Sequence, residues 1–312
     1  MPTGRCPSRR APAPAASPPD RTPIATLDPG WAAVAFGLLS ALTWGSADFG
    51  GGLAARRAPV LGVVIVSQTI GLTLAFVIAL VRGEPLPGPA DLAWATVGGL
   101  AGGIGIASLY HGLAIGRVAV VAPIAGVVAA ALPVVVGAAL QGLPGPARLA
   151  GIGLAIVAVV LVSISADPTG QRPSGVRFGL LAGLGFGLFN VFASRFTVGV
   201  VFGPLVVVRA VEAALIGALV VATRRRGNDR AWRVPRGVVP LAMAVGVGDM
   251  AGNAFFVLAA QAGRLDVAAV LSSMYPVTTI VLATALLGER MSSVQLGGVA
   301  VAATAIALIA AG

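Results

Sequence analysis

The dominant feature of the chain is a regular alternation of long apolar stretches with short polar breaks. About 20 apolar residues in a helix cross the hydrocarbon core of a bilayer, and ten stretches near that length follow one another. The breaks carry turn or charge signals, such as Arg56–Arg57–Ala58–Pro59 and the arginine-rich segment 224–236. This pattern predicts ten transmembrane helices, at residues 31–53, 60–81, 92–115, 118–140, 148–166, 177–198, 202–222, 237–260, 267–287 and 292–311.

The kind of membrane fold follows from the same pattern. Only α-helices and closed β-barrels satisfy every backbone hydrogen-bonding group inside a bilayer. The sequence lacks the ten-residue segments of alternating polarity that are typical of a membrane barrel. We therefore predict an all-α integral membrane protein.

Composition and charge exclude the main soluble classes. Of the 312 residues, 57% are hydrophobic and only 10% are charged, whereas a soluble domain carries about 25% charged residues. The net charge of +10 comes from 21 basic residues, all arginine, of which only Arg209 lies deep in an apolar stretch. Arginines that flank apolar stretches are typical of membrane topology rather than of nucleic-acid binding. The expected partners are the lipid bilayer and a small-molecule substrate, with no nucleic acid, and a homodimer stays open.

Cysteine and histidine are too few for the usual cofactor sites. The single cysteine, Cys6, allows no intramolecular disulfide and no cysteine-based metal site, and the single histidine, His111, allows no multi-histidine centre. The sequence also lacks a phosphate-binding GxxxxGK[ST] motif. We expect no metal, no cofactor and no catalytic residues.

The first 29 residues differ from the rest of the chain. They hold eight prolines and four arginines and contain no apolar run, so they do not resemble a secretory signal. We predict a disordered tail over residues 1–29. The alternative is that the natural chain starts later.

The apolar stretches fall into two related halves. A shift of 147 residues places the Gly-Arg pair at 116–117 on the same pair at 263–264, and a shift of 142 places Trp44 on Phe186. We predict five-helix repeats at residues 30–166 and 177–312, joined by a linker at 167–176. Because five is odd, the second repeat would lie upside down relative to the first. Inverted repeats of this kind are typical of alternating-access carriers.

Several segments carry a resemblance to a known family. They are GLLSALTWGSAD at 37–48, Tyr275–Pro276, LLGE at 286–289 and QLGG at 295–298. In this order they resemble the EamA branch of the drug/metabolite transporter superfamily, over roughly residues 33–311. The first half departs from the family pattern, because Gly142 stands where a glutamate would match Glu289. The resemblance implies a ten-helix carrier of small metabolites or drugs, without naming the substrate.

Ionisable residues within the predicted spans are the first candidates for function, since a charge at a helix centre costs about 2.5–3.5 kcal/mol on insertion scales. Arg209 and Glu212 are three residues apart, so they share a helix face and are predicted to form a structural ion pair. Asp249 lies at the centre of its span without an obvious partner, followed by Asn253 four residues later. Such a carboxylate would bind a proton or a substrate, or serve only as a structural hydrogen-bond acceptor.

Other polar residues complete the predicted site. Asp48 follows Trp44 by one helical turn, and the 142-residue shift places Asn190 opposite Asp48. Asp48 could instead reach water at the membrane interface, and His111 could be a hydrogen-bonded structural residue. The residues predicted to bind substrate are Trp44, Asp48, Tyr110, His111, Asn190, Asp249, Asn253 and Tyr275.

Orientation gives two conflicting expectations. The family resemblance implies that both termini are cytoplasmic. In the tail, the loops and the span ends, however, 12 arginines fall on the side opposite the termini and eight on the side of the termini. The positive-inside rule would therefore place the termini outside. We follow the family and expect a multi-pass protein of the cytoplasmic membrane.

The function predicted from these features is secondary transport. The carrier would move a small metabolite or drug by alternating access, most simply outward and coupled to protons. The alternative is a membrane scaffold or lipid-binding protein that transports nothing. An intramembrane enzyme is a weaker alternative, because Leu38 stands where a GxSx nucleophile motif around Ser40 requires glycine.

Overall fold

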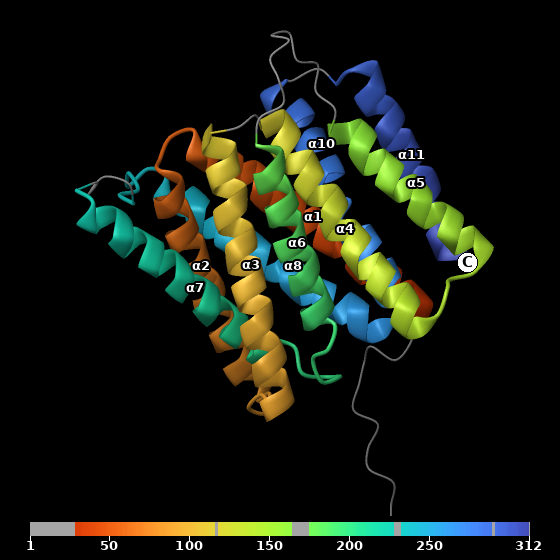
Figure 1. Ribbon diagram of the computed structural model, residues 1–312, viewed down its shortest axis with the longest axis horizontal. Coiled ribbons are helices and arrows are strands. Elements are labelled where there is room, and N and C mark those ends of the chain that lie inside the picture. The colour runs from red at the N-terminus through yellow and green to blue at the C-terminus, as the bar shows by residue number, and fades with distance from the viewer. Residues whose placement is uncertain (1–28, 116–117, 164–174, 228–231, 289–290, 312) are drawn as a thin grey trace, which may run out of the picture.

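The protein is a bundle of helices (Figure 1). A computed structural model describes residues 29–115, 118–163, 175–227, 232–288 and 291–311, and within these ranges it has helices and no strands. The prediction of an all-α protein is confirmed for this part of the chain. The helices are α1 (Pro29–Ala55), α2 (Val60–Arg82), α3 (Pro89–Ile115), α4 (Val118–Gln141), α5 (Pro146–Ser163), α6 (Val176–Ala193), α7 (Phe202–Arg225), α8 (Val239–Ala262), α9 (Leu265–Ser272), α10 (Tyr275–Leu287) and α11 (Ser293–Ala311).

Most of these helices are suited to cross a bilayer. Within the described ranges, nine helical segments are long and apolar enough to do so. One of them, Leu265–Leu287, consists of α9 and α10 together, whereas α5 contributes a shorter apolar helix at Pro146–Leu161. The prediction of a multi-pass helical membrane protein is therefore confirmed. A tenth span at α5 and an inverted relation between the halves stay predictions.

The predicted tail and the predicted linker lie mostly outside the residues that the structure describes. The predicted disordered tail lies outside the described residues, except for Pro29, which begins α1. A proline suits the first position of a helix because its missing N–H has no intrahelical partner there. Of the predicted linker, residues 167–174 also lie outside the described part, and Val176 already belongs to α6.

The α6 helix ends earlier than the apolar pattern predicts. The predicted span reached residue 198, but the helix ends at Ala193 and residues 194–201 form turns. Gly199 has a φ of 85°, a left-handed conformation that favours glycine. The apolar residues Phe196 and Val198 continue past the helix end, so hydrophobicity alone could not locate it.

The predicted span at 267–287 is two helices, α9 and α10, separated by Ser273 and Met274. Pro276 lies in the first turn of α10, and a proline cannot continue a helix from the preceding residues because it lacks an N–H and clashes with the carbonyl four positions earlier. The amide of Met274 instead donates to the carbonyl of Leu271 at 3.2 Å. The break directs the first turn of α10 towards α1, where Gly45 faces the carbonyl of Tyr275.

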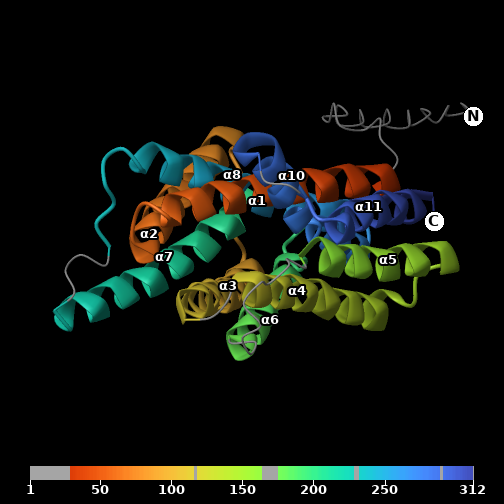
Figure 2. The same cartoon turned by 90° about the horizontal axis from the view of Figure 1, so that it is seen from above.

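The helices pack in two layers (Figure 2). In this view α1, α2, α8, α10 and α11 lie on one side and α3, α4, α5 and α6 on the other, while α7 lies between α2 and α3 and packs against both. The most extensive contacts join helices of residues 29–163 to helices of residues 175–311: α1 packs along α8, α3 and α4 pack on α6, and α5 packs on α11. The two halves of the chain are therefore interleaved rather than separate units.

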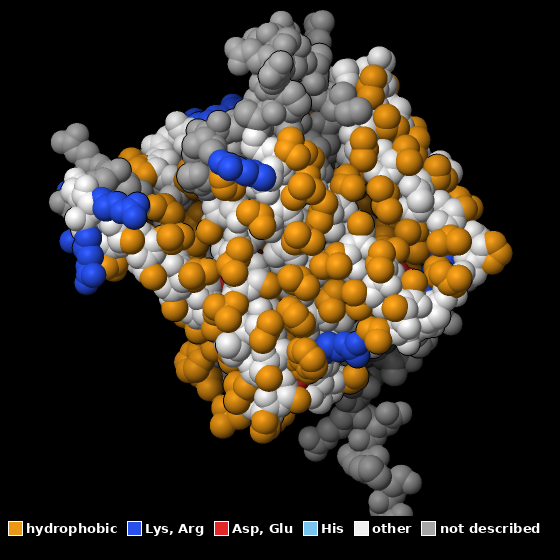
Figure 3. Space-filling view, viewed as in Figure 1, with side chains coloured by type: hydrophobic (Ala, Val, Ile, Leu, Met, Phe, Trp, Pro, Cys, Tyr) orange, Lys and Arg blue, Asp and Glu red, His pale blue; other side chains and the backbone are white. Residues whose placement is uncertain are grey.

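The outer surface is suited to lipid. Figure 3 shows hydrophobic side chains spread over one face of the bundle, while arginine side chains gather mainly at its upper left. Large apolar side chains on the helices are open to the surroundings, including Val135 of α4 at 66% and Leu80 of α2 at 65% exposure. Apolar surface on this scale marks contact with a membrane or a partner rather than with water.

The two ends of the bundle differ in their loops. We call the end at which α1 begins and α11 ends the terminal face. Because successive spans run in opposite directions, this face also holds the loops 83–88, 142–145, 194–201 and 263–264. The end of α7, with Arg224 and Arg225, lies at the opposite face.

Candidate functional site

A cluster of polar side chains surrounds the guanidinium of Arg209 in the middle of α7. Its Nη1 atom lies 2.5 Å from Oε1 of Gln68 on α2, 3.1 Å from Oε2 of Glu212 and 2.7 Å from Oδ2 of Asp249 on α8. The side chains of Arg209 and Glu212 are buried, whereas that of Asp249 is 31% exposed. We call Gln68, Arg209, Glu212 and Asp249 the central ion cluster. The structure thus brings Arg209 and Glu212 together and adds two partners from other helices.

The expectation that Asp249 lacks a partner is wrong. Arg209 reaches it from α7, because α2 packs against both α7 and α8. The approach of α2 to α8 is close: a Cβ atom at Gly246 would collide with the backbone of Ser67. The spacing of 40 residues between Arg209 and Asp249 gave no signal of the contact. A role of Asp249 in binding substrate or protons stays a prediction.

Glycines provide the room for the central ion cluster. A Cβ atom at Gly102 of α3 would lie 2.6 Å from Oε1 of Glu212, closer than non-bonded atoms approach. A Cβ atom at Gly71 of α2 would lie 3.5 Å from Nε of Arg209. Small residues at helix interfaces in membranes let the backbones approach closely, and here they also leave space for charged side chains between the helices.

The carboxylates of this region outnumber the guanidinium. Glu212 and Asp249 face Arg209, and a third carboxylate, Asp48 on α1, is an electrostatic neighbour of Asp249. By surface area Asp48 is an exposed residue of α1. In a low-dielectric interior an uncompensated charge is costly, so this excess of carboxylates is suited to a cationic partner.

A second polar contact joins α1 to α8 beside the central ion cluster. Trp44 Nε1 donates to Oδ1 of Asn253 at 2.9 Å, and the indole ring stacks on Phe256 with centroids 6.0 Å apart. Ser40 Oγ donates to the carbonyl of Gly252 at 2.9 Å, one helical turn away along α1. The indole rests directly on Gly252, where any Cβ atom would overlap the ring. The orientation of Trp44 is therefore fixed on both its edge and its face.

Tyr275 connects the broken span to this region. It begins α10, and a Cβ atom at Gly126 of α4 would lie 3.3 Å from its hydroxyl oxygen. Tyr275 is also an electrostatic neighbour of Asp48. Thr279, one turn later, donates its hydroxyl to the carbonyl of Gly45 at 3.0 Å. The start of α10 is therefore held between α1 and α4.

Three of the predicted site residues are not joined to this group by described contacts. Asn190 is buried on α6, and its Oδ1 atom has no hydrogen-bond partner among the described residues. Tyr110 and His111 belong to α3 by their backbone, but their side chains lie outside the described part of the chain. Their roles stay predictions.

Sequence reasoning missed Gln68. Gln68 on α2 is a direct partner of Arg209, although neither the repeat shifts nor the family resemblance pointed to it. Gln68 is almost fully buried, and it is the only amide side chain in α2. A lone amide within an apolar span is itself a signal of a buried polar partner, and this signal could have found it.

The central region offers groups for binding rather than for metal coordination. Among the residues whose placement is described, no group of three or more His, Cys, Asp or Glu side chains could hold a metal ion. The groups present are carboxylates, a guanidinium, an indole N–H, amides and a phenol hydroxyl. Together they suit a proton or a small polar solute, held by ion pairs and hydrogen bonds.

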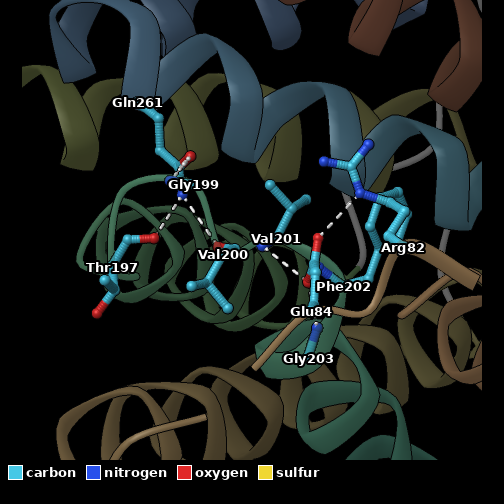
Figure 4. A network of polar contacts seen from close by, with 9 residues as sticks. All are labelled: Arg82, Glu84, Thr197, Gly199, Val200, Val201, Phe202, Gly203 and Gln261. Atoms are coloured by element: carbon cyan, nitrogen blue, oxygen red, sulfur yellow. Dashed lines mark hydrogen bonds and ion pairs between the residues drawn. The ribbon is translucent and has the colours of Figure 1, made fainter. Parts of the chain in front are cut away.

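A second polar network, which the sequence analysis did not predict, lies at the terminal face (Figure 4). In the loop between α2 and α3, Glu84 Oε2 accepts hydrogen bonds from the backbone amides of residues 201, 202 and 203, at 3.2, 2.8 and 3.0 Å. Nε of Arg82 lies 3.3 Å from the other carboxylate oxygen. A carboxylate at a helix N-terminus satisfies free amides and is stabilised by the helix dipole. Glu84 thereby ties the α2–α3 loop to the start of α7.

Two further side chains extend this network. Asp91 Oδ1 in the first turn of α3 accepts a hydrogen bond from the amide of Thr197 at 2.8 Å. Gln261 Oε1 near the end of α8 accepts from the amide of Gly199, and its Nε2 donates to two carbonyls of the same loop (Figure 4). We call Glu84, Asp91 and Gln261 the terminal clamp. An acidic residue in a loop does not reveal its partner, so the sequence held no usable signal for it.

Comparison with known proteins gives a family match over part of the chain and a shared fold. Residues 173–311 match the EamA-like transporter family, which confirms the resemblance for the second half of the chain. A crystal structure described only as that of a protein superposes with a TM-score of 0.73 at 18% identity, over 88% of this chain and 95% of that chain. At this identity the match shows the shared fold alone. No curated protein sequence matches the chain.

The first prediction concerns the glycine beneath Glu212. Gly102→Ala should displace the Glu212 carboxylate and lower the free energy of unfolding by about 1–3 kcal/mol, as overpacking does. The measurement is thermal or denaturant unfolding of the purified protein in detergent. The matched control is Gly153→Ala on α5, where a Cβ atom would meet nothing within 4 Å. Equal effects of the two substitutions would contradict the assignment.

The second prediction concerns the terminal clamp. Glu84→Ala leaves three amides at the start of α7 without their acceptor and should lower the free energy of unfolding by about 1–3 kcal/mol. Glu84→Gln keeps one acceptor oxygen and should lose less. The same unfolding measurement compares both variants with the unsubstituted chain. If Glu84→Ala unfolds no more easily than Glu84→Gln, the carboxylate does not hold α7 in place.

Proposed function

Because residues 173–311 match the EamA-like transporter family, we propose that this chain is a secondary transporter of ten transmembrane helices in two inverted five-helix repeats. It moves a small metabolite or drug across the cytoplasmic membrane by alternating access, outward and coupled to protons. Both termini lie in the cytoplasm. The observation that carries the proposal is a set of close contacts that recur in the two halves of the chain.

The clearest recurrence pairs an aromatic ring with a glycine. Trp44 of α1 lies on Gly252 of α8. The shifts of 142 and 147 residues convert this pair into Phe186 of α6 and Gly105 of α3. A Cβ atom at Gly105 would lie 2.9 Å from the Phe186 ring. The same aromatic-on-glycine contact therefore occurs once in each half, which supports a shared design of the halves.

The pattern of helix packing supports the same proposal. If α1–α5 are exchanged with α6–α11, the contact of α1 with α8 becomes that of α6 with α3, and the contact of α2 with α8 becomes that of α7 with α3. The contacts of α2 with α7 and of α5 with α11 map onto themselves. Helices α1 and α6 start from opposite faces, as inverted repeats require. Carriers with this architecture bind substrate near the bilayer midplane between the repeats.

The proposed substrate site combines the residues that meet between α1, α8 and α10. Trp44 and Asn253 present a fixed indole and amide, and Asp48 offers an exposed carboxylate. Asp249 is the more accessible carboxylate of the central ion cluster. A substrate amine or a proton would bind to Asp48 and Asp249, and release of Asp249 from Arg209 would accompany binding.

The terminal clamp supplies a gate in this proposal. Glu84 and Asp91 belong to the first repeat, and their partners at residues 197–203 belong to the second. Alternating access requires the halves to separate at one face while they close at the other. In the arrangement described here the clamp joins the halves at the terminal face, so opening of that face would break it.

The third prediction tests transport and proton coupling. A thermal-shift screen of the purified protein against amino acids, sugars, nucleosides and cationic drugs identifies a ligand, and flux of that ligand is then measured in proteoliposomes. Asp249→Asn should remove the pH dependence of flux while expression is retained, because an amide cannot exchange a proton. Asp266→Asn, a carboxylate-to-amide change in the first turn of α9, outside the terminal clamp and the proposed substrate site, should leave the pH dependence in place.

Two outcomes would count against this function. No flux of any stabilising ligand would favour a scaffold or lipid-binding protein over a transporter. Flux by Asp249→Asn with an unchanged pH profile would remove Asp249 from the coupling mechanism.

The fourth prediction tests opening at the terminal clamp. In a Cys6→Ser background, Asp91→Cys with Thr197→Cys places two thiols on opposite halves, at positions whose side-chain oxygen and amide lie 2.8 Å apart. A short bifunctional maleimide should join them and block flux. A control pair within one loop, Ser194→Cys with Thr197→Cys, should react without blocking flux. Flux that survives complete cross-linking of residues 91 and 197 would contradict the gate.

A further inference from the structure

A pocket of about 270 Å³ lies at the terminal face, away from the central ion cluster. It is formed where α1, α5 and α9 begin and α11 ends, beside the α8–α9 loop. Six of its lining residues matter for its chemistry: Trp31, Val34, Arg148, Arg264, Val267 and Ile309. Its position at the ends of apolar helices puts it at the level of lipid headgroups rather than of acyl chains.

Among the residues that the structure describes, Arg148 gives the pocket a positive charge without a partner. Nε of Arg148 is buried and has no hydrogen-bond partner, and no ion pair of Arg148 occurs among the described residues. Arg264 differs, because its guanidinium pairs with Asp266 at 2.7 Å and donates to the carbonyls of Gln141 and Gly142. A buried N–H without an acceptor is costly, so Arg148 is the group in the pocket that is suited to bind an anion.

The walls of the pocket restrict the kind of anion. Val34, Val267 and Ile309 present apolar surface, and Trp31 at the rim is 57% exposed. Tryptophan at a helix end is typical of the membrane interface. The volume is below the range of about 300–1,000 Å³ that encloses a drug-sized ligand. It suits a headgroup whose acyl chains remain outside, along the exposed apolar surface of α5 and α11.

From these features we infer that the pocket binds the headgroup of an anionic phospholipid, with the phosphate on Arg148. Guanidinium groups bind phosphate through paired N–H donors. Basic pockets between helices at a membrane face recognise anionic lipid headgroups. The apolar walls and the interfacial tryptophan favour a lipid over a free anion, because a free anion has no apolar part to contact them. This lipid site is independent of the proposed transport function.

Native mass spectrometry of the full chain tests the site. The protein is purified in detergent, delipidated and titrated with phosphatidylglycerol or phosphatidylcholine. Phosphatidylglycerol should be retained in a saturable adduct and should raise the unfolding temperature, whereas phosphatidylcholine should do neither at equal concentration. Arg148→Gln should weaken phosphatidylglycerol binding by about tenfold or more, since it removes a charge-assisted contact.

Two variants separate the pocket from general surface charge and from misfolding. Arg195→Gln removes one exposed arginine from the same face and should leave binding unchanged. Ala310 of α11 also lines the pocket. Ala310→Phe keeps Arg148 but fills the pocket and should also abolish the adduct, which preserves a test if Arg148→Gln does not fold.

The inference is overturned if Arg148→Gln binds as tightly as the unsubstituted chain or if phosphatidylcholine binds equally well. It is also overturned if inorganic phosphate at the same concentration gives the same stabilisation, because the site would then recognise the free anion.

Discussion

The interior of this protein depends on the ion pairs and the hydrogen bond made by the guanidinium of Arg209. A positive charge in the middle of a membrane-spanning helix must be neutralised by partners that reach it without water. Glu212 provides one of them from the same helix, while Gln68 and Asp249 come from α2 and α8. The positions of three helices are therefore coupled to one side chain, and the glycines between these helices allow them to come close enough.

Spacing along the sequence predicted the contact of Arg209 with Glu212 but not the contacts of Arg209 with Gln68 and Asp249. Arg209 and Glu212 lie three residues apart, so a helix alone places them on one face. Asp249 was singled out correctly as an intramembrane carboxylate, but its partner lies 40 residues away and depends on how the helices cross. Gln68 was missed, because a sequence shift aligns corresponding residues of two repeats and does not identify the residues that contact each other.

The positions of the helices could be predicted from the sequence, but some helix ends and the contacts between loops could not. Apolar length located nearly all helices within a few residues, since the bilayer sets that length. It failed at α6, where apolar residues continue past the helix end, and at Ser273–Met274, where a proline divides one span into two helices. The terminal clamp was beyond reach, because hydrogen bonds between a loop carboxylate and distant backbone amides leave no trace in the apolar pattern.

The packing contacts recur in the two halves of the chain, whereas the charged residues do not. The aromatic-on-glycine contacts occur in both halves, at Trp44 and at Phe186. The charges do not: the 147-residue shift places Gly102 at the position of Asp249, and Gly102 is the residue against which the Glu212 carboxylate rests. At these matching positions the second half has the carboxylate of Asp249. The first half has Gly102, which leaves space for the carboxylate of Glu212.

The position of Glu84 has a mechanical consequence. It holds the first amides of α7, and Arg209 lies two turns further along the same helix, about 10 Å away at the rise of an α-helix. A helix of this length behaves as a stiff rod, so the loop at the membrane surface and the charge at the core cannot move separately. Any displacement of the start of α7 shifts the guanidinium relative to the carboxylates that surround it. The helix thereby transmits movement between the loop at the membrane surface and the buried charge.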